Sequence, residues 1–278
     1  MAGVLPQDWF SRESGGLTLE EGIRDAGGDP ARLQAEARKD IAAFLELHIE
    51  QGPVLESEKL DIGVVTAIAG ITRIEIVVEG RADHAGTTPM GSRADALAAA
   101  ARLVTDIEAL AKSLSAGPGH FTATVGEFSI EPNAANVIPS RARLLIDARA
   151  EHRTAMDLFA ASVDQLAEQV ARETGTVIAP PRRISDNMPT PGDPLLLDVL
   201  DAACETAGAS HRRMASGAGH DTAFMAKVTR AAMIFVPCLG GRSHAPEEFA
   251  ETDDIALGAA VLFNAVIHLD KTLSQEDV

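Results

Sequence analysis

The 278-residue chain has few cysteines and no long apolar run. Its two cysteines, Cys204 and Cys238, lack a C-x-x-C spacing and lie in apolar surroundings, so we expect buried thiols rather than a disulfide. No run approaches the roughly 20 apolar residues that a membrane span needs, so we expect no membrane partner. The first residues lack the basic start and apolar centre of a secretion signal.

Positive charge is also scarce, with 24 Lys and Arg residues against 41 Asp and Glu, and a formal net charge of -17. Nucleic-acid binding depends on clustered Lys and Arg that neutralise phosphates, so this balance argues against a nucleic-acid partner. A hydrophobic content of 46% fits a soluble globular protein, and the length allows two domains or one domain with an insertion. These features together fit a cytoplasmic enzyme.

Motifs for nucleophilic or phosphate chemistry are missing. The chain has no G-x-S-x-G elbow, no P-loop and no G-x-G-x-x-G after a strand. Because no nucleophile stands out, water activated by a metal ion is the more economical chemistry.

Hydrophobic periodicity indicates a domain inserted within another. A strand at 73–79 is followed by a helix at 94–114, strands at 121–128 and 141–149, a helix at 153–174 and a strand at 176–183. This order is the split pattern of a ferredoxin-like sandwich. We therefore expect a ferredoxin-like (α+β) domain over 71–186, inserted into an α/β domain formed by 1–70 and 187–278. In the latter we expect helical segments across 18–42, interrupted at 27–30, and helices at 194–207 and after 253.

The stretch AFLELHIEQG, residues 43–52, alternates regularly, which predicts a strand with Glu46, His48 and Glu50 on one side. An imidazole flanked by carboxylates is a candidate metal ligand, because the carboxylates can orient it or help to hold a second cation. The alternative is an edge strand with a solvated polar face. His244, in GGRSHAPEEF, follows an apolar strand and is a second candidate ligand, although a capped helix start would also explain this stretch.

Three other stretches contain candidate substrate contacts. His84, in HAGTTPMGSR, could donate to an oxyanion or could lie in a simple turn. Asn136 lies in a Pro-bounded turn, and Arg149 ends a strand where it could bind a carboxylate or only pair with Asp147 or Glu151. The glycines of SGAGHD could receive an anion or form a tight turn.

Five stretches occur in the order and approximate spacing of one family: ELHIEQGPVLE, DHAGTTPMGSRADAL, NVIPSRARLLIDAR, SGAGHDTAFMA and GGRSHAPEEFA. The chain resembles the dinuclear-metal amidohydrolases of the hydantoinase/carbamoylase group over nearly its whole length. That group includes N-carbamoyl-L-amino acid hydrolases, allantoate amidohydrolases and bacterial-type β-ureidopropionases. The resemblance implies a metallopeptidase-like α/β catalytic domain with an inserted ferredoxin-like lid, through which the protein forms a homodimer.

The same resemblance implies the site. Its reaction would be hydrolysis of the carbamoyl or ureido C–N bond of a small carboxylate, with two divalent ions (Zn, Mn or Co). The lid residues often reach into the site of the partner subunit. The implied metal ligands are His48 and His244, the implied catalytic residue is His84, near the oxyanion, and the implied substrate-binding residues are Gln51, His84, Asn136, Arg149, Gly217, Ala218 and Gly219.

One feature departs from the family. The family carries an N-terminal segment with a His-x-Asp pair, a bridging Asp and a Glu-Glu pair, and neither Glu20-Glu21 nor His268-Leu269-Asp270 is a convincing replacement. We therefore expect an N-terminally truncated, incomplete catalytic domain that binds metal weakly. Either the sequence is a fragment or comes from a mis-started or split reading frame, or a separate chain supplies the remaining ligands. The alternatives are a catalytically incompetent fragment that retains dimerisation, or an aminoacylase or dipeptidase of the same clan.

Overall fold

The computed structural model describes residues 9–34 and 39–276. Its internal contacts divide the chain into a first and a second unit. The first unit comprises Met1–Val65, Gly192–Arg213 and His220–Val278, and the second comprises Thr66–Pro191 and Met214–Gly219. The sequence places the joints near residues 70 and 187, a few residues away, and places the glycine-rich loop at 217–219 in the catalytic domain. In the structure this loop groups with the second unit.

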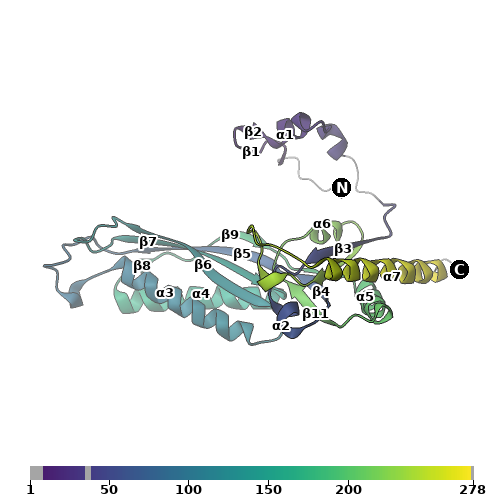
Figure 1. Ribbon diagram of the computed structural model, residues 1–278. Helices are drawn as coiled ribbons and strands as arrows, with labels where there is room; N and C mark the ends of the chain where they lie inside the picture. Colours follow the sequence, from purple (N-terminus) through teal and green to yellow (C-terminus); the bar gives the residue numbers. More distant parts are fainter. Residues whose placement is uncertain (1–8, 35–38, 277–278) are drawn as a thin grey trace. The chain divides into compact units, whose positions relative to one another are not determined.

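The second unit is an antiparallel sheet covered by two helices (Figure 1). Its elements are β5 (Gly70–Glu79), α3 (Ala96–Ser115), β6 (Phe121–Glu131), β7 (Arg141–Ala150), α4 (Arg153–Thr174), β8 (Val177–Ile178) and β9 (Arg182–Asn187). The strand order is β6-β7-β5-β8, and β9 also pairs with β5. This arrangement is the predicted ferredoxin-like sandwich, so the predicted fold class is confirmed.

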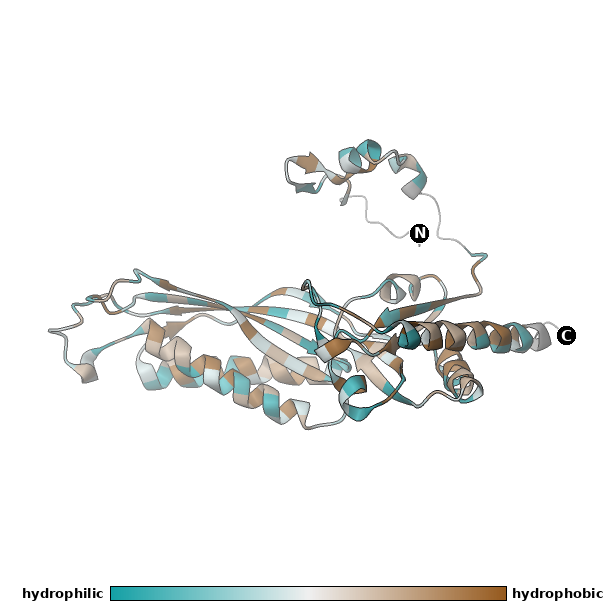
Figure 2. Ribbon diagram, in the orientation of Figure 1, coloured by the Kyte–Doolittle hydropathy of each residue, from teal (hydrophilic) through white to brown (hydrophobic). Residues whose placement is uncertain are grey.

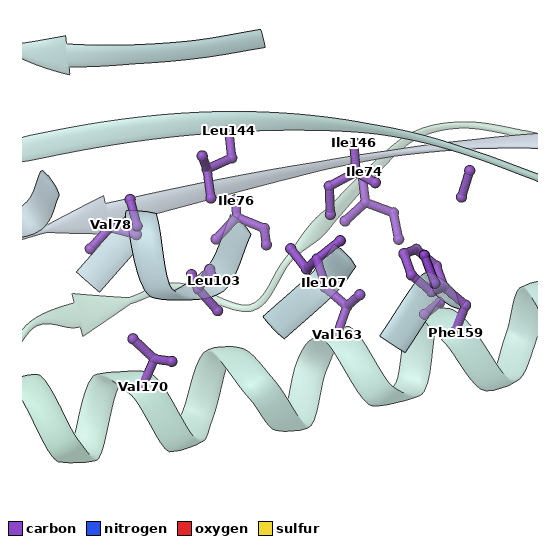
Figure 3. Close-up of a cluster of buried hydrophobic side chains, with 14 of the residues drawn as sticks. Ile74, Ile76, Val78, Leu103, Ile107, Leu144, Ile146, Phe159, Val163 and Val170 are labelled. Atoms are coloured by element: carbon purple, nitrogen blue, oxygen red, sulfur yellow. The ribbon is translucent and has the colours of Figure 1, made fainter. Parts of the chain in front are cut away.

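The core of the second unit lies between α3, α4 and one face of the sheet (Figure 3). Alternation along β7 directs Leu144 into this core, where it lies in one buried cluster with Leu103 of α3 and Phe159 of α4. The same alternation puts Asp147 and Arg149 on the opposite face, which the two helices leave uncovered.

One predicted strand of this unit is wrong. The sequence predicts a single strand at 176–183, but the structure has two short strands, β8 and β9, that both pair with β5. Pro180 and Pro181 separate them, because proline has no N–H to donate to a neighbouring strand.

The first unit contains the strand predicted from AFLELHIEQG, which is β3 (Ala43–Ile49). The other larger elements of this unit are α2 (Val54–Glu58), β4 (Ile62–Ile68), α5 (Pro194–Ala207), β11 (His211–Ser216), α6 (Thr222–Met225), β12 (Arg230–Val236) and α7 (Thr252–Glu276). β12 lies between β3, which is parallel to it, and β4, which is antiparallel. β11 also pairs with β4, and β10 (Thr190–Pro191) pairs with Ile68 and Ala67 of that strand. Among the described residues β3 pairs only with β12, so its other edge is open.

The core of the first unit joins the sheet to α5 and α7 and contains the buried Leu200 and Val261. By length and composition alone α7 could cross a membrane over Thr252–Leu273, the only such helix in the described part of the chain. The sequence predicts no such helix. Val261 and Leu269 pack into the core, and 22% of the apolar stretch of α7 is buried. The other side of α7 exposes Phe263 and Val266, and Figure 2 shows the apolar residues along this helix.

The N-terminal segment is less helical than predicted. A short hairpin, β1 (Glu13–Ser14) and β2 (Leu17–Thr18), leads into α1 (Leu19–Asp25), and a 3₁₀ turn follows at Pro30–Gln34. Residues 35–38, part of the second predicted helical segment, lie outside the described residues, and 39–42 are not helical. Glu21 and Thr18 form a capping box at the start of α1, so this carboxylate has a local structural role.

Candidate functional site

Glu46 of β3 and Glu50, which directly follows this strand, each bind the start of a different helix of the first unit. Glu46 Oε2 accepts hydrogen bonds from the N–H and the hydroxyl of Thr222, at 2.8 and 2.6 Å, at the start of α6. Glu50, which is buried, accepts from the N–H groups of Val54 and Leu55, both at 2.8 Å, at the start of α2. The two carboxylates therefore hold two helix N-termini, where a negative charge is favourable.

His48, between them, is oriented by its own backbone. Its Nδ1 lies 2.8 Å from the carbonyl oxygen of Ile49. Because a carbonyl can only accept, a neutral His48 carries its proton on Nδ1 and keeps a lone pair on Nε2, which is the tautomer that a metal ligand needs. The ring of the buried His220 packs edge-on against the ring of His48, with 4.7 Å between the ring centroids. The ring centroid of Phe235 lies 5.4 Å from that of His220. His220 belongs to the stretch SGAGHD, of which only the glycines are candidates from the sequence, so this contact is not predicted.

Burial lowers the pKa of His220 to about 4, with a smaller contribution from the neighbouring His48. His220 is therefore neutral at neutral pH, and it adds no positive charge where it packs against His48.

The loop that carries His244 approaches the end of β3. Gln51 donates a hydrogen bond from Nε2 to Ser243 Oγ at 2.7 Å. A Cβ added to Gly241 would lie 2.7 Å from the carbonyl carbon of Gly52, so the two loops pack backbone to backbone. His244 itself is exposed and has a φ of 57°, and its N–H donates to the carboxylate of Glu248 at 2.8 Å.

Glu248 links the two predicted metal ligands electrostatically. Its pKa lies below the usual range, first because of the His244 N–H and the Ser243 side chain, and then because of the charges of His244 and His48. His48 and His244 therefore share one neighbourhood in the first unit. Glu248 has no predicted role from the sequence.

His84 and Asn136 lie together in the second unit. His84 forms a β-bridge with Val137, and the N–H of Ala85 donates to the Asn136 carbonyl at 3.0 Å. The N–H of Gly86 donates to His84 Nδ1 at 3.0 Å, so a neutral His84 carries its proton on Nε2. His84 and Asn136 are both exposed. This arrangement offers an outward N–H donor of the kind that the oxyanion role requires.

Arg149 lies beside the glycine-rich loop of the same unit. Its Nε donates to Asp147 at 2.8 Å and its Nη1 donates to the Gly217 carbonyl at 2.7 Å. The pairing with Asp147 that the sequence left open is thus present. Among the described residues Nη2 has no partner, and 32% of the side chain is exposed, so the end of the guanidinium remains open.

The second unit does not bring its predicted site residues to one place. Arg149 pairs with Ile71 at one end of β5, while Arg141 pairs with Glu79 at the other end. His84 lies beyond that second end. Glu79 lies eight residue steps after Ile71, which is about 26 Å of extended strand at about 3.3 Å per residue. His84 and Arg149 of one copy therefore lie at opposite ends of the sheet.

Comparison with known proteins identifies the family. Residues 16–268 match the sequence profile of peptidase family M20/M25/M40. The chain belongs to this family. An N-carbamoyl-L-amino-acid amidohydrolase of Paenarthrobacter aurescens is 37% identical over 92% of this chain and 62% of its own length. An allantoate amidohydrolase of Bacillus subtilis is 37% identical over 93% of this chain and 62% of its own length.

A solved structure of an M20-family relative supports the fold. An amidase of the hydantoinase/carbamoylase family from Burkholderia multivorans superposes with a TM-score of 0.84 at 36% identity, over 93% of this chain and 62% of that chain. The chain thus spans less than two thirds of the length of these relatives. The resemblance read from the five sequence stretches is confirmed.

The M20 family generally uses a dinuclear divalent metal site, and the described residues do not complete one. No three His, Cys, Asp or Glu side chains among them gather as a group that could hold a metal ion. Glu46 and Glu50 already accept hydrogen bonds from helix N-termini. Two ions need several ligands each and a water position, so His48 and His244 supply only part of such a set.

The two cysteines are buried free thiols, as predicted, and burial raises the pKa of Cys204 to about 12.

Proposed function

We propose that this chain is the substrate-binding part of a hydrolase that cleaves the carbamoyl or ureido C–N bond of a small carboxylate. The names of the relatives support this proposal, because N-carbamoyl-L-amino acids and allantoate each carry a carboxylate close to a ureido or carbamoyl group. We place the protein in the cytoplasm, in keeping with its charge and composition.

The observation that carries the proposal is the open end of Arg149. Asp147 and Gly217 occupy Nε and one side of Nη1, which fixes the plane of the guanidinium. The second N–H of Nη1 and both N–H groups of Nη2 have no partner among the described residues, and 32% of the side chain is exposed. A planar fork of this kind matches the two oxygens of a carboxylate, and a lysine cannot reproduce it.

The other residues take roles that fit their geometry. The outward Nε2–H of His84 would donate to the carbonyl oxygen as negative charge develops there. Asn136 would recognise the amide, and Gln51 and the loop Gly217, Ala218 and Gly219 would contact the substrate. His48, with its free Nε2 lone pair, and His244 would be ligands of a site for two divalent ions, zinc, manganese or cobalt. That site needs further ligands from elsewhere.

We further propose that another polypeptide, a separate chain or more of the same protein, packs on the first unit and supplies those ligands. Two surfaces favour it: β3 has an open edge, and α7, which contacts β3, exposes 66% of Phe263 and 53% of Val266. Open edges and exposed apolar surface are typical of binding surfaces. The relatives, which are longer, have more chain with which to cover them.

We also propose a homodimer through the second unit. The edge strand β6 is 11 residues long and, among the described residues, pairs only with β7. Two copies could join their sheets at this edge. Such a dimer would let His84 of one copy act with Arg149 of the other, which the distance of about 26 Å along one extended sheet does not allow within a copy.

The decisive experiment is hydrolysis by the assembled protein. The chain would be mixed with the segment of the Paenarthrobacter aurescens relative that has no counterpart here, plus Zn²⁺, Mn²⁺ or Co²⁺. Ammonia release would then be followed with N-carbamoyl-L-amino acids, allantoate and ureidoglycolate. We expect turnover by the mixture and its loss with His48→Ala. No release from any of these substrates by a mixture shown to form a complex would refute the proposed function.

A further inference from the structure

His120 lies beside the contact between Arg149 and Gly217, and no sequence motif gives it a role. It immediately precedes β6 in the second unit, and its backbone is fixed on both sides. Its carbonyl accepts from the N–H of Glu151 at 2.9 Å, and its N–H donates to Glu151 Oε2 at 3.1 Å. The other oxygen of Glu151 accepts from the Thr66 hydroxyl at 2.7 Å. The imidazole therefore projects from a rigid position.

The ring of His120 occupies the space next to Gly217. A Cβ added to Gly217 would lie 3.0 Å from Nε2 and 3.5 Å from Cε1 of this ring. The nitrogen Nε2 is buried, and it has no hydrogen-bond partner among the described residues. Burial is the main cause that lowers the pKa of His120; Glu151 acts against it and Arg149 lowers it further, and the net shift is downward, which favours the neutral ring. His120 thus contacts Gly217 by shape and not through a hydrogen bond.

Gly217 transmits this contact to Arg149. Its carbonyl accepts the hydrogen bond from Nη1, one of the two bonds that set the plane of the guanidinium. If the ring were removed, Gly217 would lose the surface against which it rests, and its carbonyl could shift away from Nη1. Arg149 would then keep only the bond to Asp147, about which the guanidinium can swing.

We propose that His120 is a positioning residue of the carboxylate subsite: its ring braces Gly217, whose carbonyl holds Arg149 with the Nη2 end open to a carboxylate. This inference rests on the proposed role of Arg149 in carboxylate binding. It adds a residue that contacts neither the substrate nor a metal ligand, and it explains why a glycine stands at position 217.

A double-mutant cycle on thermal stability tests the brace without any ligand. Gly217→Ala should lower the Tm of the otherwise unchanged chain, because the new methyl group meets the His120 ring. In a His120→Ala background the same substitution should lower the Tm little or not at all. Gly126→Ala is the matched control, since a Cβ there meets nothing within 4 Å, and its effect should be the same in both backgrounds. An equal change in Tm on Gly217→Ala in both backgrounds would show that the His120 ring does not support Gly217.

The preference for a carboxylate tests the consequence for Arg149. Calorimetry would compare N-carbamoyl-L-alanine with its carboxamide. His120→Ala should weaken binding of the acid by about tenfold, as expected for a weakened charge-assisted hydrogen bond, and should leave the carboxamide unchanged. The double variant His120→Ala/Gly217→Ala, whose methyl group fills the vacated space, should regain part of the preference.

The outcomes distinguish the proposed role of Arg149 from the positioning role of His120. If the unchanged chain does not prefer the acid, the proposed role of Arg149 fails, whatever the stability cycle shows. If the unchanged chain prefers the acid and His120→Ala retains the full preference, the positioning role of His120 fails while the proposed function stands.

Discussion

In the second unit Arg149 has its orienting partners, Asp147 and Gly217, within the same unit. In the first unit His48 and His244 share a neighbourhood in which the described residues do not supply enough ligands for two ions. The surfaces differ in the same way. The helices of the second unit cover one face of its sheet with a closed core, while the first unit leaves the β3 edge and part of α7 open. Metal binding therefore depends on further polypeptide more than the orientation of Arg149 for substrate recognition does.

The largest expected loss of stability comes from a substitution in the core of the second unit. Phe159 is buried between α4 and the sheet, so Phe159→Ala should cost about 3–5 kcal/mol through a cavity. Amide exchange across that unit should accelerate while exchange in α5 and α7 stays slow. Phe263→Ala, at an exposed phenylalanine of α7, is the matched control and should change stability by less than about 0.5 kcal/mol. Equal destabilisation by both changes would remove the contrast between the units.

A second prediction concerns ligand recognition. Arg149→Lys should weaken binding of N-carbamoyl-L-alanine by about 10- to 100-fold, because a point charge replaces a planar fork that is held by two hydrogen bonds. Calorimetry on the chain alone measures this. Arg73→Lys is the control, since Arg73 pairs with Asp147 on the same sheet and has no proposed contact with the ligand. An unchanged affinity after Arg149→Lys would contradict the assignment.

Acid should destabilise the second unit through Asp186. The hydrogen bond from Arg153 lowers the pKa of Asp186 to about 2 from its ordinary value of 3.8. The folded state therefore binds this proton less readily than the unfolded state, and the stabilisation is present above pH 4 and lost as the pH falls towards 2. Asp186 is exposed and solvent screens its pairing with Arg153, so the stabilisation stays below about 2 kcal/mol. Asp186→Asn should remove this part of the pH dependence in urea unfolding. An identical acid profile would show that the pair contributes nothing.

The smallest effect tests the structural role of the carboxylates on β3. Glu46→Ala should cost about 0.5–2 kcal/mol as a lost cap of α6. Amide exchange of Thr222, whose N–H donates to Glu46, should rise most. Glu248→Ala, at an exposed carboxylate in the same unit, is the comparison and should leave α6 unchanged. Unaltered exchange at Thr222 would count against the capping role.

The sequence predicts the elements of the fold well wherever the pattern is local. The alternation in AFLELHIEQG and the helices at 153–174 and 194–207 correspond to β3, α4 and α5. The capping roles of Glu46 and Glu50 could not be predicted in this way. Glu46 bonds to Thr222, 176 residues away, and only the folded register joins them.

The same limit applies to the site. His220 and His120 gain their positions from packing against His48 and Gly217, contacts that no spacing rule encodes. The five sequence stretches nevertheless indicate the family correctly, because they carry residues whose identities are set by local turns and by chemistry.

Titration of the chain with Zn²⁺ tests the contrast between the two units most directly. Alone, the chain should bind zinc weakly and without a stoichiometry of two. Mixed with the missing segment of the Paenarthrobacter aurescens relative, it should bind two ions tightly, and His48→Ala should abolish one or both. Two tightly bound zinc ions on the chain alone, lost with His48→Ala, would contradict the account.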